Sequence, residues 1–124
     1  SRDWSSDVCS SDLAKMTASR EAGEPITLAR TASIADGLLA LRPGELTFAH
    51  VQAFVDEIVT VPEDAIGDAI GWLFSEARLV AEPSGAVATA GVLAAGASAR
   101  GGAVAIVSGG NVSAEDFAGY LRTR

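Results

Sequence analysis

Residues 101–116 constrain the fold more than any other stretch of the chain. Positions 103–107 read Ala-Val-Ala-Ile-Val, a short apolar run with β-branched residues at alternate positions and glycines on either side. Such a run is typical of a strand that is buried on both faces of a parallel sheet. We therefore expect a strand at 103–107.

A glycine turn and a helix start follow this expected strand. The sequence Ser-Gly-Gly-Asn at 108–111 tolerates positive φ angles and lets a ligand approach the backbone closely. Ser113 and Asp116 have the spacing of a capping box, which predicts a helix over 114–121. Ser108 is then expected at the carboxyl end of a strand, where open α/β sheets bind ligands. On the pattern alone, an ordinary strand-to-helix turn is the more frequent explanation.

The rest of the chain predicts helices that alternate with one further strand. Alternating β-branched residues indicate a strand at 57–61, and an apolar stripe predicts a helix from Pro62 to Arg78. The other expected helices are a short turn at 15–20, a helix capped by Thr47, and an apolar helix over 86–95 capped by Ser84. The stripe of the helix after Pro62 consists of Ile66, Ile70, Leu73, Phe74 and Ala77.

This order of elements predicts an α/β fold with helices packed on a mostly parallel sheet. Gly91 within the apolar helix is tolerable if another element approaches it closely. Two strands do not complete an open sheet, so we interpret the chain as a fragment of a larger domain.

Residues 1–13 differ from the rest of the chain. They are rich in Ser and Asp, lack periodicity and contain the only cysteine. The segment resembles the translation of a sequencing-library adapter, so we predict that it is not native and that residues 14–124 form a partial domain. The formal net charge of −7 argues against non-specific nucleic-acid binding, and we find neither a secretory signal nor a transmembrane segment.

Few side chains suggest chemistry by themselves. His50 has no second histidine near it, which disfavours a metal site and predicts a surface position. Lys15, the only lysine, lies in a polar segment and is expected to be solvated. For Glu82 and Asp36, backbone capping is the simplest interpretation. The carboxylate pairs at 63–64 and 115–116 lie in expected first helical turns and are interpreted as compensating the helix dipole.

Six segments, taken together, resemble the pyridoxal-phosphate-dependent threonine/serine dehydratases, which share fold type II with serine racemase. They occur in the family's order and spacing from residue 14 to the C-terminus. The segments are Lys-Met-Thr-Ala-Ser at 15–19, Thr-Ala-Ser-Ile-Ala-Asp-Gly-Leu at 31–38, Arg-Pro-Gly-Glu-Leu-Thr-Phe at 42–48, Val-Asp-Glu-Ile-Val-Thr-Val at 55–61, Leu-Val-Ala-Glu-Pro-Ser-Gly-Ala at 79–86 and Val-Ser-Gly-Gly-Asn-Val at 107–112.

The resemblance implies the C-terminal part of the large domain of a fold type II enzyme, with pyridoxal 5'-phosphate as cofactor. It implies that Ser108 donates a hydrogen bond to the pyridine nitrogen and that the backbone of Gly37 lies beside the cofactor. It places Glu82 near the cofactor ring and Gly109 in the turn below it, with Gly110 and Asn111 as structural support. The lysine that binds the cofactor covalently, the phosphate loop and any metal-binding carboxylates are expected upstream of this chain.

The implied activity is that of an ammonia-lyase, which converts a β-hydroxy amino acid to a 2-oxo acid and ammonia. An amino-acid racemase of the same family and a non-catalytic α/β module remain alternatives. Because the cofactor-binding lysine is expected upstream, we predict that the 124-residue chain is inactive by itself. The intact enzyme is expected to be a cytoplasmic homo-oligomer that acts on a small amino acid and needs neither nucleic acid nor a membrane.

Overall fold

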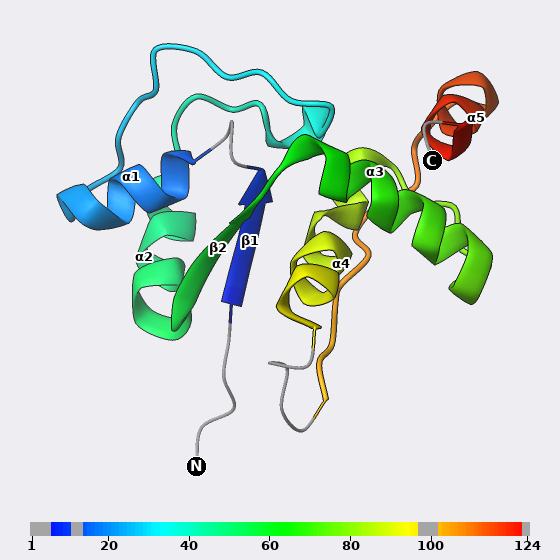
Figure 1. The fold of residues 1–124 in the computed structure, drawn as a ribbon. Coiled ribbons are helices and arrows are strands. Elements are labelled where there is room, and N and C mark those ends of the chain that lie inside the picture. The colour runs from blue at the N-terminus through cyan, green and yellow to red at the C-terminus, as the bar shows by residue number, and fades with distance from the viewer. Residues whose placement is uncertain (1–5, 11–13, 97–101, 123–124) are drawn as a thin grey trace.

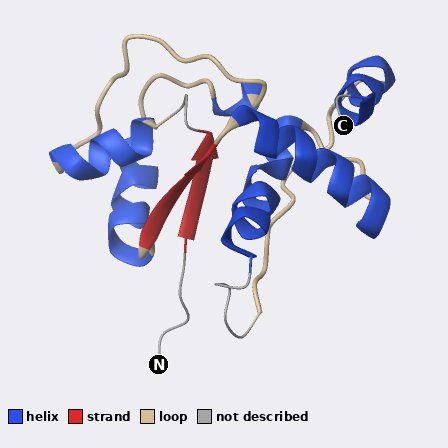
Figure 2. Cartoon of the chain, in the orientation of Figure 1, coloured by secondary structure: helices blue, strands red, loops and turns tan. Residues whose placement is uncertain are grey.

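A computed structural model describes residues 6–10, 14–96 and 102–122, in which helices cover both faces of a two-stranded parallel sheet (Figures 1 and 2). The strands are β1 (Ser6–Ser10) and β2 (Glu57–Val61), paired with Ser6 opposite Glu57. The helices are α1 (Lys15–Ala22), α2 (Glu45–Phe54), α3 (Glu63–Trp72), α4 (Pro83–Ala95) and α5 (Ala114–Arg122). None of these described helices combines the length and the hydropathy needed to cross a lipid bilayer.

The alternation of side chains along β2 separates the two hydrophobic clusters. Ile58 packs against a cluster that contains Met16 of α1 and Phe48 of α2. Val61, an odd number of residues away, points to the opposite face and joins the main core with α3 and α4. The strand predicted at 57–61 is confirmed, and so is the α/β arrangement of helices on a parallel sheet.

The main core lies between α3 and α4. Ile66 and Ile70 are fully buried there, as the apolar stripe predicts, and Leu73 is only 3% exposed. Phe74 differs from the prediction, because it is 40% exposed and makes an edge-on contact with Phe117 of α5, with ring centroids 5.5 Å apart. The last turn widens to a π-helix over Leu73–Ala77, which rotates the following residues away from the core and leaves Ala77 exposed.

Gly91 allows β1 to lie against α4. A Cβ atom at this position would be 2.9 Å from both Cγ atoms of Val8, so an alanine would fit only if Val8 moved. The expectation that Gly91 permits a close approach is therefore confirmed. The approaching element, however, belongs to the N-terminal segment that is predicted to be non-native.

Residues 6–10 form β1 although their side chains show no strand pattern. Backbone N–H and C=O groups make the ladder, so an extended segment can pair with β2 without a matching side-chain sequence. Residues 6–10 therefore pair with the partial domain predicted at 14–124. Its non-native origin stays a prediction, and residues 1–5 and 11–13 lie outside the described part of the chain.

The strand predicted at 103–107 is wrong. Residues 102–113 belong to no helix or sheet among the described residues, and Val104 and Ile106 are 92% and 74% exposed. A strand requires a neighbouring strand for its backbone hydrogen bonds, and no described segment supplies one here. Side-chain pattern alone does not show whether that neighbour is present. Residues 97–101, which precede this segment, lie outside the described part of the chain.

Three predicted helix starts shift by one to three residues. Helix α2 begins at Glu45 with Gly44 as N-cap instead of Thr47, and α4 begins at Pro83 with Glu82 as N-cap instead of Ser84. Pro62 is the N-cap of α3 and not its first residue. The start of α5 is confirmed in detail, since Ser113 Oγ accepts a hydrogen bond from the Asp116 N–H at 3.1 Å.

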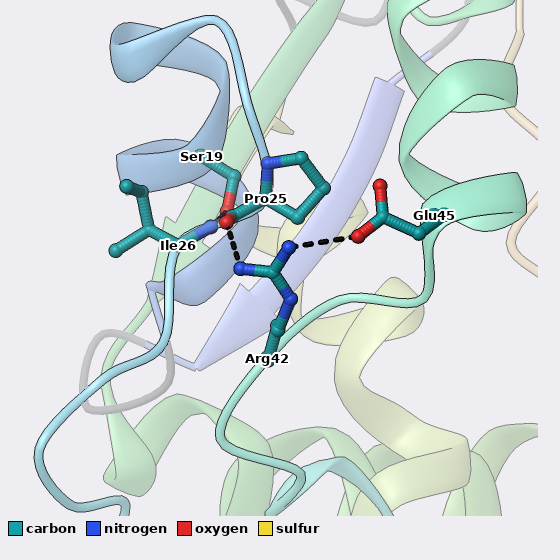
Figure 3. Close-up of polar contacts among 5 residues, drawn as sticks. All are labelled: Ser19, Pro25, Ile26, Arg42 and Glu45. Atoms are coloured by element: carbon teal, nitrogen blue, oxygen red, sulfur yellow. Dashed lines mark hydrogen bonds and ion pairs between the residues drawn. The ribbon is translucent and has the colours of Figure 1, made fainter.

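The long connection between α1 and α2 is held at its base by polar contacts (Figure 3). The Arg42 guanidinium donates to the carbonyl of Pro25 and, at 2.7 Å, to the Glu45 carboxylate, while the Ile26 N–H donates to Ser19 Oγ at 2.8 Å. These contacts fix both ends of the loop that carries Gly37. The exposed His50 ring contacts the Leu46 carbonyl, so the surface position predicted for it is confirmed.

Candidate functional site

The N-terminus of α4 brings together segments that are far apart in the sequence. Two of them are the 3-10 turn Asp36–Leu38 and the glycine turn after residue 107. Pro83 occupies the first helical turn, where a missing N–H costs little, and the Gly85 and Ala86 N–H groups donate to the Glu82 carbonyl. The candidate site is therefore organised around one helix start.

Ser84 joins this helix start to the turn that carries Gly37. Its Oγ accepts a hydrogen bond from the Gly37 N–H at 2.9 Å and lies 3.5 Å from Asp36 Oδ1. A Cβ atom on Gly37 would be 2.9 Å from the same Oγ, so a side chain there would push Ser84 away. The role expected for Ser84 as a helix cap is thus replaced by a contact across 47 residues.

Glu82 and Gly109 meet on the other side of the helix start. The Glu82 N–H donates to the Gly109 carbonyl at 3.1 Å, and a Cβ atom on Gly109 would lie 2.9 Å from Glu82 Cδ. A Cβ atom on Gly85 would lie 2.8 Å from the Gly109 backbone nitrogen. A side chain at 85 would meet the backbone of Gly109, whereas a side chain at 109 would require the Glu82 carboxylate to move.

Ser108 is exposed and lines an open cavity of about 280 Å³ together with Ser84 and Leu38. All four residues proposed from the sequence as cofactor contacts therefore lie around one helix N-terminus. Ser108 and Gly109 follow the segment 102–107. Glu82 is the N-cap of α4, and the Gly37 N–H donates a hydrogen bond to Ser84 Oγ. Although Glu82 occupies the N-cap position, its side chain makes no capping hydrogen bond, so the side chain does not have the capping role predicted for it.

Lys15 corrects one prediction. It is half-buried, and its ammonium group donates to the Leu38 carbonyl at 2.5 Å, so it is not simply solvated. This contact attaches the start of α1 to the turn that contains Gly37. A polar local sequence gave no indication of it, because Leu38 is 23 residues away.

Glu63 is a further residue at this site that sequence patterns missed. Its carboxylate accepts hydrogen bonds from Ser33 Oγ at 2.6 Å and from the Ile34 N–H at 2.9 Å. The interpretation as a helix-dipole carboxylate explains its position in the first turn of α3 but not these partners. Glu63 thereby fixes the segment that leads into Gly37.

Tyr120 connects α5 to the same region. It is half-buried against the main core, and this burial raises the pKa of its hydroxyl, with the negative charges of Asp116 and Asp36 as smaller causes. Leu38, which follows Gly37, packs against the same core.

We expect the chain to lose stability as the pH rises above about 10, partly through Tyr120. Because its pKa is higher when folded than its usual value near 10, the folded chain holds this proton longer, and stability falls with pH in that range. Tyr120→Phe should reduce this loss while changing stability little at pH 7. Tyr120 is the only tyrosine, so its ultraviolet titration measures the shift directly. Equal titration of folded and urea-unfolded chains would contradict the prediction.

Helices on both faces of a parallel sheet, with a glycine-lined helix start at one end, define an α/β domain. The chain belongs to the family of pyridoxal-phosphate-dependent enzymes, whose sequence model matches residues 8–109. The resemblance and the fold class predicted from the sequence are thereby confirmed.

Three individual proteins show how far the similarity extends. The L-threonine ammonia-lyase of Thermotoga maritima is 42% identical over 106 residues, which cover 85% of this chain and 26% of that protein. The solved T.th. threonine deaminase superimposes with a TM-score of 0.83 at 35% identity, over 89% of this chain and 37% of its own. Maize serine racemase gives a TM-score of 0.73 at 30% identity, over 94% and 38%. The chain spans well under half the length of each.

Proposed function

We propose that this chain is part of a pyridoxal-phosphate-dependent ammonia-lyase that converts threonine or serine to a 2-oxo acid and ammonia. The relatives named threonine dehydratase, threonine ammonia-lyase and threonine deaminase support this activity. The observation that carries it is the meeting of Gly37, Glu82 and Gly109 around the start of α4.

The residues present fit the cofactor. Because residues 37 and 109 are glycines, the Ser84 hydroxyl and the Glu82 carboxylate lie directly against the backbone there, so polar groups that can contact the cofactor gather at the start of α4. The Ser108 hydroxyl, exposed toward the cavity, is a neutral donor for the pyridine nitrogen. Pyridoxal phosphate, when bound, stabilises negative charge at the substrate Cα.

A neutral hydroxyl does not keep the pyridine nitrogen protonated as a carboxylate would. The electron demand at Cα is then moderate, which favours loss of the β-hydroxyl over transamination. Glu82, beside Gly109, is proposed to orient the cofactor ring from its edge. The Lys15 ammonium group donates a hydrogen bond to the Leu38 carbonyl. We therefore assign the covalent attachment of the cofactor to the part of the enzyme outside this chain.

The test joins the upstream part of the Thermotoga maritima relative to residues 6–124 and assays 2-oxo acid formation from threonine and serine. We expect turnover in the chimera and none in the isolated chain, which should also show no visible absorbance with pyridoxal phosphate. Ser108→Ala should lower kcat by about tenfold or more, because a hydrogen bond to the ring is lost, and Ser108→Thr should restore part of it. Full activity of the alanine variant would contradict the role of Ser108.

A racemase is the second candidate, favoured by the likeness to maize serine racemase. Chiral chromatography of serine after incubation with the chimera separates the two activities, since only a racemase yields the opposite enantiomer. We further propose that the intact enzyme is a cytoplasmic homo-oligomer, in keeping with relatives named biosynthetic dehydratases. Size-exclusion chromatography with light scattering tests the oligomeric state.

A further inference from the structure

The turn that carries Gly37 belongs to a loop whose two ends are joined. Thr31 Oγ1 donates a hydrogen bond to the Leu39 carbonyl at 2.7 Å, which closes the segment 31–39 at its base. Gly37 is exposed, and within this segment Ala35 alone is fully buried. Because a single buried residue anchors a loop weakly, the position of the Gly37 backbone depends on polar contacts from the neighbouring helices.

Two helices hold the turn itself. Lys15 of α1 donates a hydrogen bond to the Leu38 carbonyl, and Ser84 of α4 accepts one from the Gly37 N–H at 2.9 Å. Both contacts are made to residues 37 and 38. The part of the loop that precedes them is held by a third helix, α3, and Figure 1 shows the turn, in cyan, beside the start of this helix.

Glu63, in the first turn of α3, holds the preceding part of the loop with both carboxylate oxygens. Oε1 accepts a hydrogen bond from Ser33 Oγ at 2.6 Å, and Oε2 accepts one from the Ile34 N–H at 2.9 Å. Ser33 Oγ accepts a further hydrogen bond from the Ala35 N–H at 3.0 Å. Hydrogen bonds to a carboxylate are stronger than those between neutral groups, and two of them fix both the position and the direction of the chain.

We propose that Glu63 is a positioning residue for the cofactor, which acts by holding the backbone at Gly37 in place. Leu38, the next residue, lines the cavity of about 280 Å³ that Ser108 also lines, so a displaced turn changes the shape of the cofactor site. A shift of about 1 Å in a binding group costs an enzyme about a hundredfold in rate, even when its cause is distant. The inference rests on the cofactor site proposed around Gly37 and not on the identity of the substrate.

Asp64 separates this role from simple stabilisation of the helix start. It follows Glu63 in the first turn of α3, is exposed, and its carboxylate accepts a hydrogen bond from the Ala65 N–H at 2.9 Å. Both carboxylates compensate the helix dipole, because both lie in the first turn. Glu63 differs in that it reaches the loop, so Asp64→Ala is the matched control for Glu63→Ala.

The experiment measures the affinity for pyridoxal phosphate of the chimera with the upstream part of the Thermotoga maritima relative, from its visible absorbance. Glu63→Ala should raise the Kd about tenfold, because both hydrogen bonds to the loop are lost, and Asp64→Ala should change it less than about twofold. Glu63→Gln keeps an acceptor for the Ile34 N–H, and its amide can donate to Ser33 Oγ. The Kd of this variant should therefore rise by less than about threefold.

This comparison distinguishes positioning from a merely structural role. A structural role lowers Tm and leaves the Kd of the folded protein unchanged at room temperature. Equal Kd values for Glu63→Ala and Asp64→Ala, or a glutamine variant as weak as the alanine variant, would overturn the proposal. If Glu63→Ala does not fold, Ser33→Ala takes its place, because it removes one of the two donors. Its Kd should rise about threefold, and an unchanged Kd refutes the proposal.

Hydrogen exchange in the 124-residue chain gives a readout that needs no cofactor. The Gly37 amide should exchange at least about tenfold faster in Glu63→Ala than in the original chain, because the loop no longer holds it against Ser84. Asp64→Ala should leave this exchange unchanged. Unchanged exchange at Gly37 in Glu63→Ala contradicts the proposal.

The outcomes also separate this proposal from the ammonia-lyase activity. Cofactor binding that depends on Glu63, without turnover of threonine or serine, contradicts the ammonia-lyase activity alone. Turnover with a Kd that Glu63→Ala does not change contradicts the positioning role alone. A folded chimera that binds no pyridoxal phosphate overturns both.

Discussion

Gly85→Ala should destabilise the chain by about 2 kcal/mol and displace the Gly109 turn. The added Cβ would lie 2.8 Å from the Gly109 nitrogen, and backbone on both sides leaves no side chain to rotate away. Overpacking of this kind costs about 1–3 kcal/mol, more than the helix propensity that alanine gains over glycine. Urea denaturation measures the loss, and exchange at the Glu82 amide reports the broken bond to Gly109.

Gly67→Ala is the matched control for this prediction. Gly67 also lies inside a helix, α3, but a Cβ there would meet nothing within 4 Å. The same substitution should therefore stabilise the chain by about 0.5–1 kcal/mol. Opposite signs at the two positions would support the contact between Gly85 and Gly109, and stabilisation at both would refute it.

Ile70→Ala should cost about 3 kcal/mol, the largest effect we expect from a single truncation. Ile70 is fully buried between α3 and α4, and removing its side chain loses both apolar contact and volume that the packed helices do not refill. Leu46→Ala on α2 removes a similar side chain that is 75% exposed, and should change stability by less than about 0.5 kcal/mol.

The milder Ile70→Val keeps this prediction measurable if the alanine variant unfolds. It should cost about 0.5–1.5 kcal/mol. Urea titrations of the four chains, including the original, give the order of stability. An Ile70→Val variant as stable as the original chain would show that this position is not packed as the structure describes.

Sequence patterns correctly predicted the elements that form through interactions between residues close together in the chain. The strand at 57–61 follows from alternation, and the start of α5 follows from the spacing of Ser113 and Asp116. The strand at 103–107 failed because its formation depends on a neighbouring strand that no described segment supplies. The structure of β1 was missed because backbone pairing left no pattern in its side chains.

Sequence patterns were also less informative about the candidate site, whose residues are far apart in the chain. Its four proposed residues came from resemblance, and the sequence alone did not indicate that they would meet at the start of α4. Glu63 and Lys15 were misjudged because their partners lie 23 to 30 residues away, beyond any helical or strand period. Contacts of this kind are set by packing, which a single sequence does not display.

The parallel pairing of β1 with β2 has a consequence for the order in which the chain folds. Each residue of β1 faces one in a distant part of the sequence, Ser6 opposite Glu57 and Ser10 opposite Val61. Closing so long a loop costs entropy before any contact repays it, whereas α3 and α4 are neighbours along the chain. The helical pair is therefore expected to form early and to act as a template, and β1 to add to β2 in a late and slower step.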